Sequence, residues 1–335
     1  MTDYVLPPDL VASDIEWSLF DNTAVFASPL SGAVRTVSRP GTRWGVRMTF
    51  RAVSSQDRRR LMALIATLRG RTNRLWVTDP AYTIAGSMPS PELITNSSAV
   101  VNTTGWTSSG AELVLSSDSA FGLRLTRTGV TAAQNANQGA VTLVNSAPYA
   151  VQFHAAQGKG NIRFSMRCGS TSGGSEMLSG ITYTASARYV AGFTSTATTG
   201  YFNIRDFTLN RNAGDFQFFP WVSAARCAFV NGASQTGSSL LLKSLPTSTN
   251  GLLRAGDWIE VNSELKRLIA DLDSDSSGGG TVLFEPALRA SPADNTPVVF
   301  RNPMGKFLLA EESVSYGTRP GILSDIELSL IEDVT

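Results

Sequence analysis

The sequence has almost none of the side chains that metal sites and many hydrolases use. Its 335 residues include a single histidine, His154, and two cysteines, Cys168 and Cys227, which lie far apart. These three positions lack the spacing of a zinc site. Without a G-x-S-x-G motif, the histidine also has no recognisable nucleophile. We therefore expect His154, in a strand-like stretch, to be structural, and we expect neither a metal nor another cofactor.

Targeting and membrane signals are likewise missing from the sequence. The stretch MTDYVLPPDL lacks a basic region followed by an apolar one. No apolar run approaches the roughly 20 residues of a membrane helix. We therefore expect synthesis in a cytoplasm, no membrane insertion, and two buried thiols in the reduced state.

Charged residues are scarce and unevenly distributed. They make up 16% of the chain, against roughly 25% in an average soluble domain. The net charge of +1 gives no overall field that favours nucleic acid or membrane. Residues 1–91 hold 11 basic and 7 acidic side chains (+4), residues 92–230 hold 9 and 6 (+3), and residues 231–335 hold 8 and 14 (−6). The two ends of the chain therefore carry opposite charge.

Alternation of apolar and polar residues predicts strands in the first segment. Residues 14–28 alternate, residues 29–41 look like a turn-rich connection, and residues 43–53 give the clearest strand of the chain. The polar face of that strand carries Arg43, Arg47 and Arg51.

A single amphipathic helix is predicted at about residues 55–69. Ser54 is suited to cap it, with Asp57 three residues on, and Gly70 is suited to end it. One side of the helix carries a buried stripe: Leu61, Leu64, Ile65 and Leu68.

The middle of the chain has a different composition. Residues 86–98 are rich in proline and serine and indicate a linker. Short strands separated by Gly, Ser and Asn then recur to about residue 230, with no second amphipathic helix. Such a run predicts a β-sandwich or jelly roll. We therefore expect residues 92–230 to be an inserted jelly-roll domain of the carbohydrate-binding type.

The last segment resembles the first in composition. Residues 231–305 predict a small β meander or barrel, and the final strand places Asp325, Glu327 and Asp333 on one face. We expect this strand to pair with residues 43–53, because opposite charges on neighbouring strands are mildly stabilising. Residues 1–91 and 231–335 would then form one discontinuous core domain, a β-sandwich or barrel with one helix. Alternatively, the basic and acidic surfaces meet between subunits.

Three acidic residues raise the question of a cation site. Asp271, Asp273 and Asp275 have the 1, 3, 5 spacing of a calcium loop. Ser276 and Val282 occupy the positions where such a loop needs Gly and Glu. Solvation of a hairpin tip is the favoured interpretation, and a weak cation site is the alternative.

Aromatic residues are numerous in the middle segment, given its low charge. Most should fill the sandwich core, but an exposed ring can stack on the apolar face of a sugar. The candidate glycan-binding residues are Trp221, Tyr201 and Tyr189. Trp221, at an expected strand end, should be the most exposed.

The recurring arginines have two interpretations: an ion-paired, solvated sheet face, or a path for nucleic acid. Trp44 and Phe50 point away from the arginine face, so the first interpretation is favoured. Together with the start of the helix, these charged faces supply candidate subunit contacts: Arg43, Arg47, Arg51, Arg58, Arg59, Arg60, Asp325 and Glu327.

Both ends of the chain resemble a known family. The first 80 residues contain SPLSGAVRTVSRPGTRWGVRMTF, SSQDRRRLMALIATLRG and RLWVTDP, and the closing part runs from LLRAGDWIEV to PVVFRNPMGKFLLAEE. These stretches, covering about 190 of the 335 residues, resemble distal tail proteins of long, flexible-tailed bacteriophages (siphophages). The middle segment, with ELITNSSAVVNTTGWTSSG and FNIRDFTLNR, is similar to jelly-roll carbohydrate-binding modules.

The resemblance implies a structural virion protein without enzymatic activity. Distal tail proteins form a ring, usually a hexamer, that joins the tail tube to the tail tip, hub or baseplate. DNA passes through the lumen without specific binding. An inserted module would sit outside, where it contacts host-surface glycan or receptor-binding proteins. The expected location is the virion tail tip, after synthesis in the cytoplasm of the bacterial host.

Two other functions fit the sequence. One is a free-standing carbohydrate-binding adhesin in which the insert makes the contact. The other is a cell-wall glycan hydrolase, which would need paired carboxylates in a cleft. Asp206 and Asp215 are the nearby acidic pair of the insert, and neither belongs to a recognisable motif.

Overall fold

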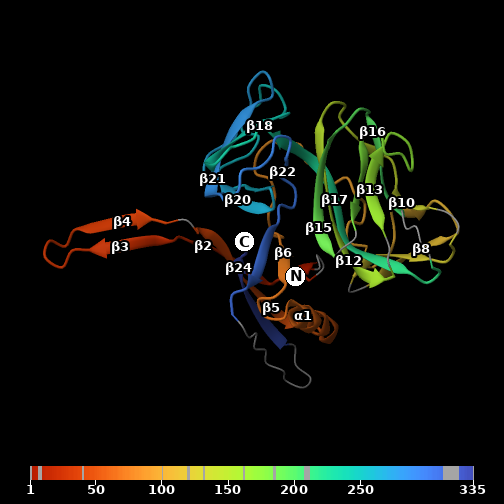
Figure 1. Ribbon diagram of the computed structural model, residues 1–335, viewed down its shortest axis with the longest axis horizontal. Helices are drawn as coiled ribbons and strands as arrows, with labels where there is room; N and C mark the ends of the chain where they lie inside the picture. Colours follow the sequence, from red (N-terminus) through yellow and green to blue (C-terminus); the bar gives the residue numbers. More distant parts are fainter. Residues whose placement is uncertain are drawn as a thin grey trace.

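The protein is mainly β, as the sequence predicts, and the residues that the structure describes include one α-helix. Figure 1 shows a sheet near both chain ends, a two-layer sandwich on one side of it, a small barrel, and a hairpin that projects away from the sandwich. The computed structural model describes residues 2–6, 10–39, 41–99, 101–118, 121–130, 133–160, 163–183, 186–206, 212–311 and 324–334.

Six strands from the first and last parts of the chain form one sheet, here called the terminal sheet. In spatial order they are β1 (Asp3–Val5), β6 (Arg74–Val77), β23 (Gly305–Leu309), β24 (Ser324–Glu332), β5 (Arg43–Val53) and β2 (Asp14–Phe20). Only the β1–β6 pair is parallel among these pairs. Apolar side chains on one face are buried, and three of them, Met48, Phe307 and Leu328, are at most 1% exposed. The alternation in residues 43–53 therefore does bury one face of the sheet.

The antiparallel pairing of β24 with β5 confirms the neighbour relation predicted from charge. Arg47 Nε lies 2.6 Å from Glu327 Oε1. Asp325 Oδ1 accepts a hydrogen bond from Ala52 N at 2.9 Å. The division of the chain into domains at residues 91 and 231 stays a prediction.

Asp333 does not lie on the exposed acidic face, so that placement is wrong. β24 ends at Glu332, and beyond it Asp333 turns inward, 2.5 Å from Arg74 Nε. Both side chains are buried, and a buried guanidinium needs a counter-charge. Glu332 makes a similar pair with Arg289 at 2.5 Å. The end of the chain is thus fixed by ion pairs as well as by strand pairing.

The helix α1 (Ser55–Leu68) has nearly the predicted bounds. Ser54 Oγ accepts a hydrogen bond from a main-chain N–H of the first turn at 3.1 Å. At the other end Arg69 adopts a left-handed conformation, with φ +48°. Leu61 and Leu68 are buried in the cluster that contains the core of the terminal sheet. The helix therefore covers this core.

A separate hairpin projects from the body of the protein (Figure 1). It consists of β3 (Thr23–Ala27) and β4 (Val34–Ser38), and we call residues 23–38 the arm. The expectation of a turn-rich connection over residues 29–41 is wrong for β4. Its sequence VRTVS places two valines three residues apart, so the alternation that marks a strand is missing.

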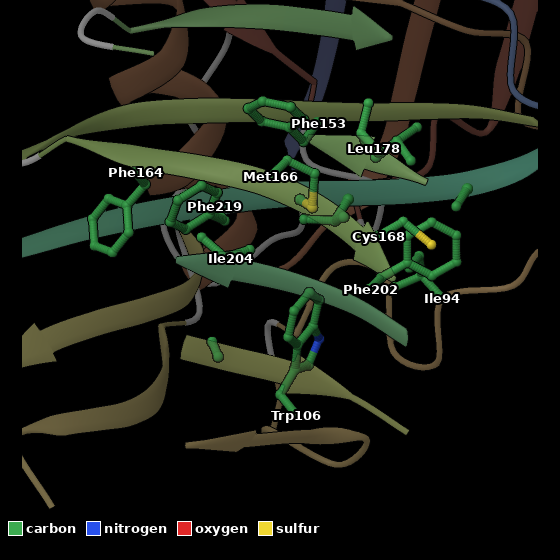
Figure 2. Packing of buried hydrophobic residues seen from close by; sticks show 14 of the residues in the cluster. Ile94, Trp106, Phe153, Phe164, Met166, Cys168, Leu178, Phe202, Ile204 and Phe219 are labelled. Atoms are coloured by element: carbon green, nitrogen blue, oxygen red, sulfur yellow. The ribbon is translucent and has the colours of Figure 1, made fainter. Parts of the chain in front are cut away.

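The middle of the chain is a two-layer β-sandwich. One layer has the order β14 (Leu178–Tyr183), β13 (Phe164–Gly169), β16 (Thr199–Asp206), β10 (Asn135–Gln138) and β7 (Trp106–Ser108), with β11 (Val141–Thr142) beside β16. The other layer has β15 (Ala187–Thr194), β12 (Pro148–Lys159), β17 (Phe216–Val230), β9 (Gly122–Arg127) and β8 (Leu113–Asp118). Figure 2 shows the rings of Phe153, Phe164, Phe202 and Phe219 in the core, and all four are fully buried.

Strand β17 continues beyond the sandwich into a small barrel. Six strands close this barrel in the order β17, β18 (Gly237–Lys243), β21 (Gly280–Leu288), β20 (Glu264–Leu268), β19 (Trp258–Val261) and β22 (Pro297–Val299), with β22 again paired to β17. The 15 residues of β17 therefore belong to both units.

The segment expected to be a linker is packed against its surroundings. In residues 86–98, Met88 N donates to Leu252 O and Leu93 N donates to Ala224 O, both at 2.9 Å. Met88 is 5% exposed. The proline and serine content thus marks irregular backbone, not a free tether.

Both cysteines are free and buried, as predicted. Burial raises the pKa of both thiols. Because the thiolate is the reactive form, Cys168 and Cys227 should react slowly with thiol reagents.

The pairing of the chain ends can be tested in β24. Leu328→Ala removes a buried side chain from the core of the terminal sheet, so we expect the free energy of unfolding to fall by about 2–5 kcal/mol. Ser329→Ala, at the next position, should change it by roughly 0.5 kcal/mol or less. Urea unfolding followed by fluorescence measures both. Equal, small effects would show that β24 does not belong to this core.

Candidate functional surfaces

A buried ion pair joins the sandwich to the barrel. Arg188 of β15 donates from Nη1 to Glu260 Oε1 of β19 at 2.5 Å and from Nη2 to Oε2 at 2.7 Å. The guanidinium lies over the ring of Trp76 at 4.7 Å and also donates to the side chain of Gln152. Glu260 Oε2 accepts a further hydrogen bond from Met304 N at 2.9 Å. Charge, stacking and hydrogen bonds thus hold the sandwich, the barrel and the terminal sheet together at one point.

His154 lies at the same junction. Its Nε2 is 2.9 Å from the carbonyl oxygen of Asp3, so Nε2 carries the hydrogen in the neutral ring. Burial lowers the pKa of His154 to about 4. The histidine is therefore neutral at pH 7 and connects β12 to β1.

Removal of one partner should break the ion pair at a high cost. Arg188→Met leaves a buried carboxylate without its counter-charge, so we expect a loss of about 3–5 kcal/mol in the free energy of unfolding. The double variant Arg188→Met/Glu260→Gln removes both charges and keeps an acceptor for Met304 N. The loss of the double variant should be clearly smaller than the sum of the losses of Arg188→Met alone and Glu260→Gln alone. Urea unfolding of the wild type, the two single variants and the double variant at pH 7 measures these losses. Additive losses would show that the two charges act independently.

The buried histidine should lower the free energy of unfolding as the pH is lowered. The unfolded chain takes up a proton near pH 6.5, whereas the folded protein does so only near pH 4. Stability is therefore lost as pH falls below 6.5, by about 2 kcal/mol at pH 5. His154→Gln, whose amide can donate to the same carbonyl, should lack this loss. Burial raises the pKa of Glu92, which acts in the opposite direction in both proteins. Parallel stability curves for the two proteins between pH 7 and pH 5 would contradict the assignment.

The three aromatic residues predicted to bind glycan lie apart. Trp221 is 4% exposed and packs in a cluster with Trp76 at the junction, so its expected exposure is wrong. The reason is that β17 does not end there but runs on into the barrel. Tyr189 stacks on Phe153 of the sandwich core at 5.1 Å, and Tyr201 lies half-buried in the other layer. These residues do not form one sugar-binding surface.

The three aspartates of the expected cation site have separate structural roles. Asp271 Oδ2 pairs with Arg254 Nη1 at 2.6 Å, and Asp273 Oδ1 accepts from Gly251 N at 2.6 Å. Asp275 Oδ1 accepts from two main-chain N–H groups of its own turn, at 2.7 and 2.8 Å. No cluster of three or more potential metal ligands occurs within the described ranges. The spacing in the sequence is thus explained by turn formation.

Several charged residues predicted to join subunits have partners within the chain. Arg47 pairs with Glu327, Asp325 accepts from the main chain of β5, and Arg60 lies 3.3 Å from Asp57. The remaining candidates lie at or near the surface: Arg43, Arg51, Arg58 and Arg59. Their use as subunit contacts stays a prediction.

The acidic pair considered for glycan hydrolysis is buried. Asp206 is fully buried and pairs with Arg127, which is itself 1% exposed. Asp215 is 5% exposed, and its carbonyl oxygen accepts from Arg127 N at 2.9 Å. Both side chains are buried within the sandwich, and they do not line an open cleft of the kind that a glycosidase needs.

The arm exposes apolar side chains on both of its faces. Val25 and Val34 share one face, and Phe26 and Val37 share the other, by the register of the hairpin. Each of the four is at least half exposed, and Leu30 at the tip is 98% exposed. The sequence analysis missed this surface because apolar residues of a strand are normally assigned to a core.

A second surface missed from the sequence lies on the outer side of the sandwich. Phe218 of β17 stands opposite Arg124 of β9. The ring of Phe218 lies 5.0 Å from that of Phe121 and 5.2 Å from that of Phe216. Arg124 Cζ lies 4.0 Å from the centre of the Phe216 ring. We call these four residues the aromatic face.

Comparison with known proteins gives only distant similarities. No protein-family model and no curated protein sequence matches the chain.

No helix among the described residues is long and apolar enough to cross a membrane.

Three solved structures are similar to parts of the chain. The enzymatically active domain of tailspike protein 4 from bacteriophage CBA120 has 16% identity and a TM-score of 0.30 over 40% of this chain and 21% of its own length. A carbohydrate-binding module of Cellvibrio mixtus lichenase 5A, solved with cellotriose, has 14% identity and a TM-score of 0.25 over 39% of this chain and 96% of its own. The adhesin domain of Epf from Streptococcus pyogenes has 13% identity and a TM-score of 0.26 over 63% and 79%. The chain thus spans about a fifth of the tailspike domain. At these low scores the similarities carry no argument about function.

Proposed function

We propose that the protein is a structural subunit of a phage tail tip. In this proposal it is a distal tail protein that assembles into a closed ring through its arm, with the sandwich on the outside and no catalytic role. The observation that carries the proposal is the exposed apolar arm. The resemblance of both chain ends to distal tail proteins supports it.

An isolated arm of this kind needs a partner. A lone two-stranded hairpin is only marginally stable in water. Here each of its faces carries two exposed apolar side chains, and its tip carries Leu30. Exposed apolar surface of this kind marks an interaction site. Burial of the arm against another subunit would stabilise both the hairpin and the assembly.

The partner that fits is a second copy of this chain. The arm leaves the body directly after β2, which is an edge strand of the terminal sheet. An arm that packs at the corresponding edge of the next copy makes a head-to-tail contact. Such contacts close into a ring when the rotation between copies permits it.

The position of the insert agrees with this arrangement. Figure 1 shows the arm and the sandwich on opposite sides of the terminal sheet. Contacts made by the arm therefore leave the far side of the sandwich free for a host-surface glycan or another tail protein. The family resemblance alone implies the other partners, which are the tail tube and the tail hub or baseplate. It also implies the passage of DNA through the lumen.

A free-standing carbohydrate-binding adhesin is the second candidate function. The observation that favours it is the aromatic face, which lies on the sandwich and does not depend on the arm. This candidate predicts a monomer that binds glycan.

Assembly can be tested with the arm intact but polar. We expect the wild-type protein to associate as its concentration rises, and Phe26→Asp to raise the concentration needed by about 30-fold or more, as for a central interface residue. Val144→Asp likewise replaces an exposed apolar side chain with a carboxylate, here on the sandwich, and should leave association unchanged. Light scattering with negative-stain imaging measures both. A wild-type monomer at all concentrations would contradict assembly through the arm and favour the adhesin.

A further inference from the structure

The aromatic face is built into the sandwich by strand alternation. Leu123 and Leu125 of β9 and Phe219 of β17 point into the core and are at most 1% exposed. Arg124 and Phe218, which alternate with them, therefore point to the outer side. Trp221 is covered by the terminal sheet, whereas this end of β17 lies beyond that cover. The described part of the chain thus leaves this cluster of rings partly open to solvent.

The rings form a continuous surface. Phe121 is 48% exposed, and Phe216 and Phe218 are half-buried. Phe121 is held in place because its N–H donates to Asp118 Oδ1 at 2.9 Å. Neighbouring ring centres are 5.0 and 5.2 Å apart, and the ring planes are inclined to one another by 33° and 68°. The exposed ring of this cluster, Phe121, offers the apolar area on which the CH face of a sugar stacks.

Arg124 contacts aromatic rings and no carboxylate within the described part of the chain. Arg47, Arg74 and Arg188 each bind a carboxylate. Arg124 instead stacks on two rings, 4.0 Å from Phe216 and 5.8 Å from Phe218, and no carboxylate lies within ion-pair distance of it in the described residues. Stacking holds a guanidinium in place while its outer N–H groups stay free for bidentate binding of an anion.

The surroundings of the face are cationic and hydroxylated. Lys159 is the strand partner of Phe216 and is exposed. Thr126 is the partner of Phe216 on the other side, and Ser116 is the partner of Arg124. Asp118, the nearby acidic group, is engaged by the N–H of Phe121. The charge of the face is therefore complementary to an anion, and the hydroxyl groups match those of a sugar.

From this geometry we infer that the aromatic face binds an acidic carbohydrate. One sugar ring stacks on Phe121, which the ring of Phe218 supports, and its carboxylate binds the guanidinium of Arg124. The inference deepens the proposed function, because it rests on the proposal that the insert contacts host-surface glycan. It names the place and the class of glycan.

The test uses the whole chain and matched glycans. The probes are 3′-sialyllactose against lactose and α-1,4-trigalacturonate against α-1,4-galactotriose, measured by titration calorimetry. We expect an acidic probe to bind about tenfold more tightly than its neutral partner, because hydrogen bonds to charged groups are the stronger ones. Binding of the acidic probe should weaken as salt is added.

Two variants separate stacking from charge. Phe218→Ala should weaken binding of acidic and neutral probes alike by about tenfold. Arg124→Gln should remove the preference for the acidic probe and leave binding of the neutral probe unchanged. Leu241→Ala and Arg51→Gln make the same kinds of change at exposed positions elsewhere and should have no effect. Circular dichroism and melting temperature show whether each variant is folded.

The outcomes are distinct from those of the assembly test. Failure of every acidic probe to bind more tightly than its neutral partner overturns the inference. So does wild-type binding by folded Arg124→Gln and Phe218→Ala. A ring that binds no acidic probe would refute the glycan site and leave the proposed assembly standing. A monomer that binds an acidic probe would support the glycan site and refute the proposed assembly.

Discussion

The buried pair of Arg188 and Glu260 is the contact on which the arrangement of the molecule depends. Two charges removed from water must face each other closely, because neither can be left alone at an acceptable cost. The pair therefore specifies how β15 of the sandwich lies against β19 of the barrel. Trp76 and Met304, which bind the same two side chains, add the terminal sheet to this point. This contact thus relates the sandwich to the barrel and to the terminal sheet.

Covalent connections reinforce this arrangement. The chain enters the sandwich through residues 86–98, which are hydrogen-bonded on both sides, and leaves it through β17, which is shared with the barrel. Neither crossing is a free tether. The sandwich, and with it the aromatic face, is thus held by two backbone crossings and one ion pair.

Local patterns in the sequence predicted those elements of the fold that depend on residues close together in the chain. Residues 43–53 and the helix were found nearly to the residue, because alternation, a capping serine and an apolar stripe are written in consecutive positions. The pairing of β5 with β24 was accessible because charge marks both strands. Arg188 and Glu260 carry no such mark: they are single residues 72 positions apart, and only the folded chain brings them together. Trp221 and Asp333 were misplaced for the same reason, since their burial depends on distant segments.

Strand β17 also determines how the molecule would respond to tension. Its 15 residues span roughly 50 Å, from Phe216 at the aromatic face to Val230 in the barrel. Its hydrogen bonds to β12 and β22 lie across the strand direction. A pull applied at the aromatic face therefore runs along one continuous backbone and loads these bonds together, in shear, rather than opening them one at a time. A surface that holds an attached particle against flow would gain mechanical strength from this geometry.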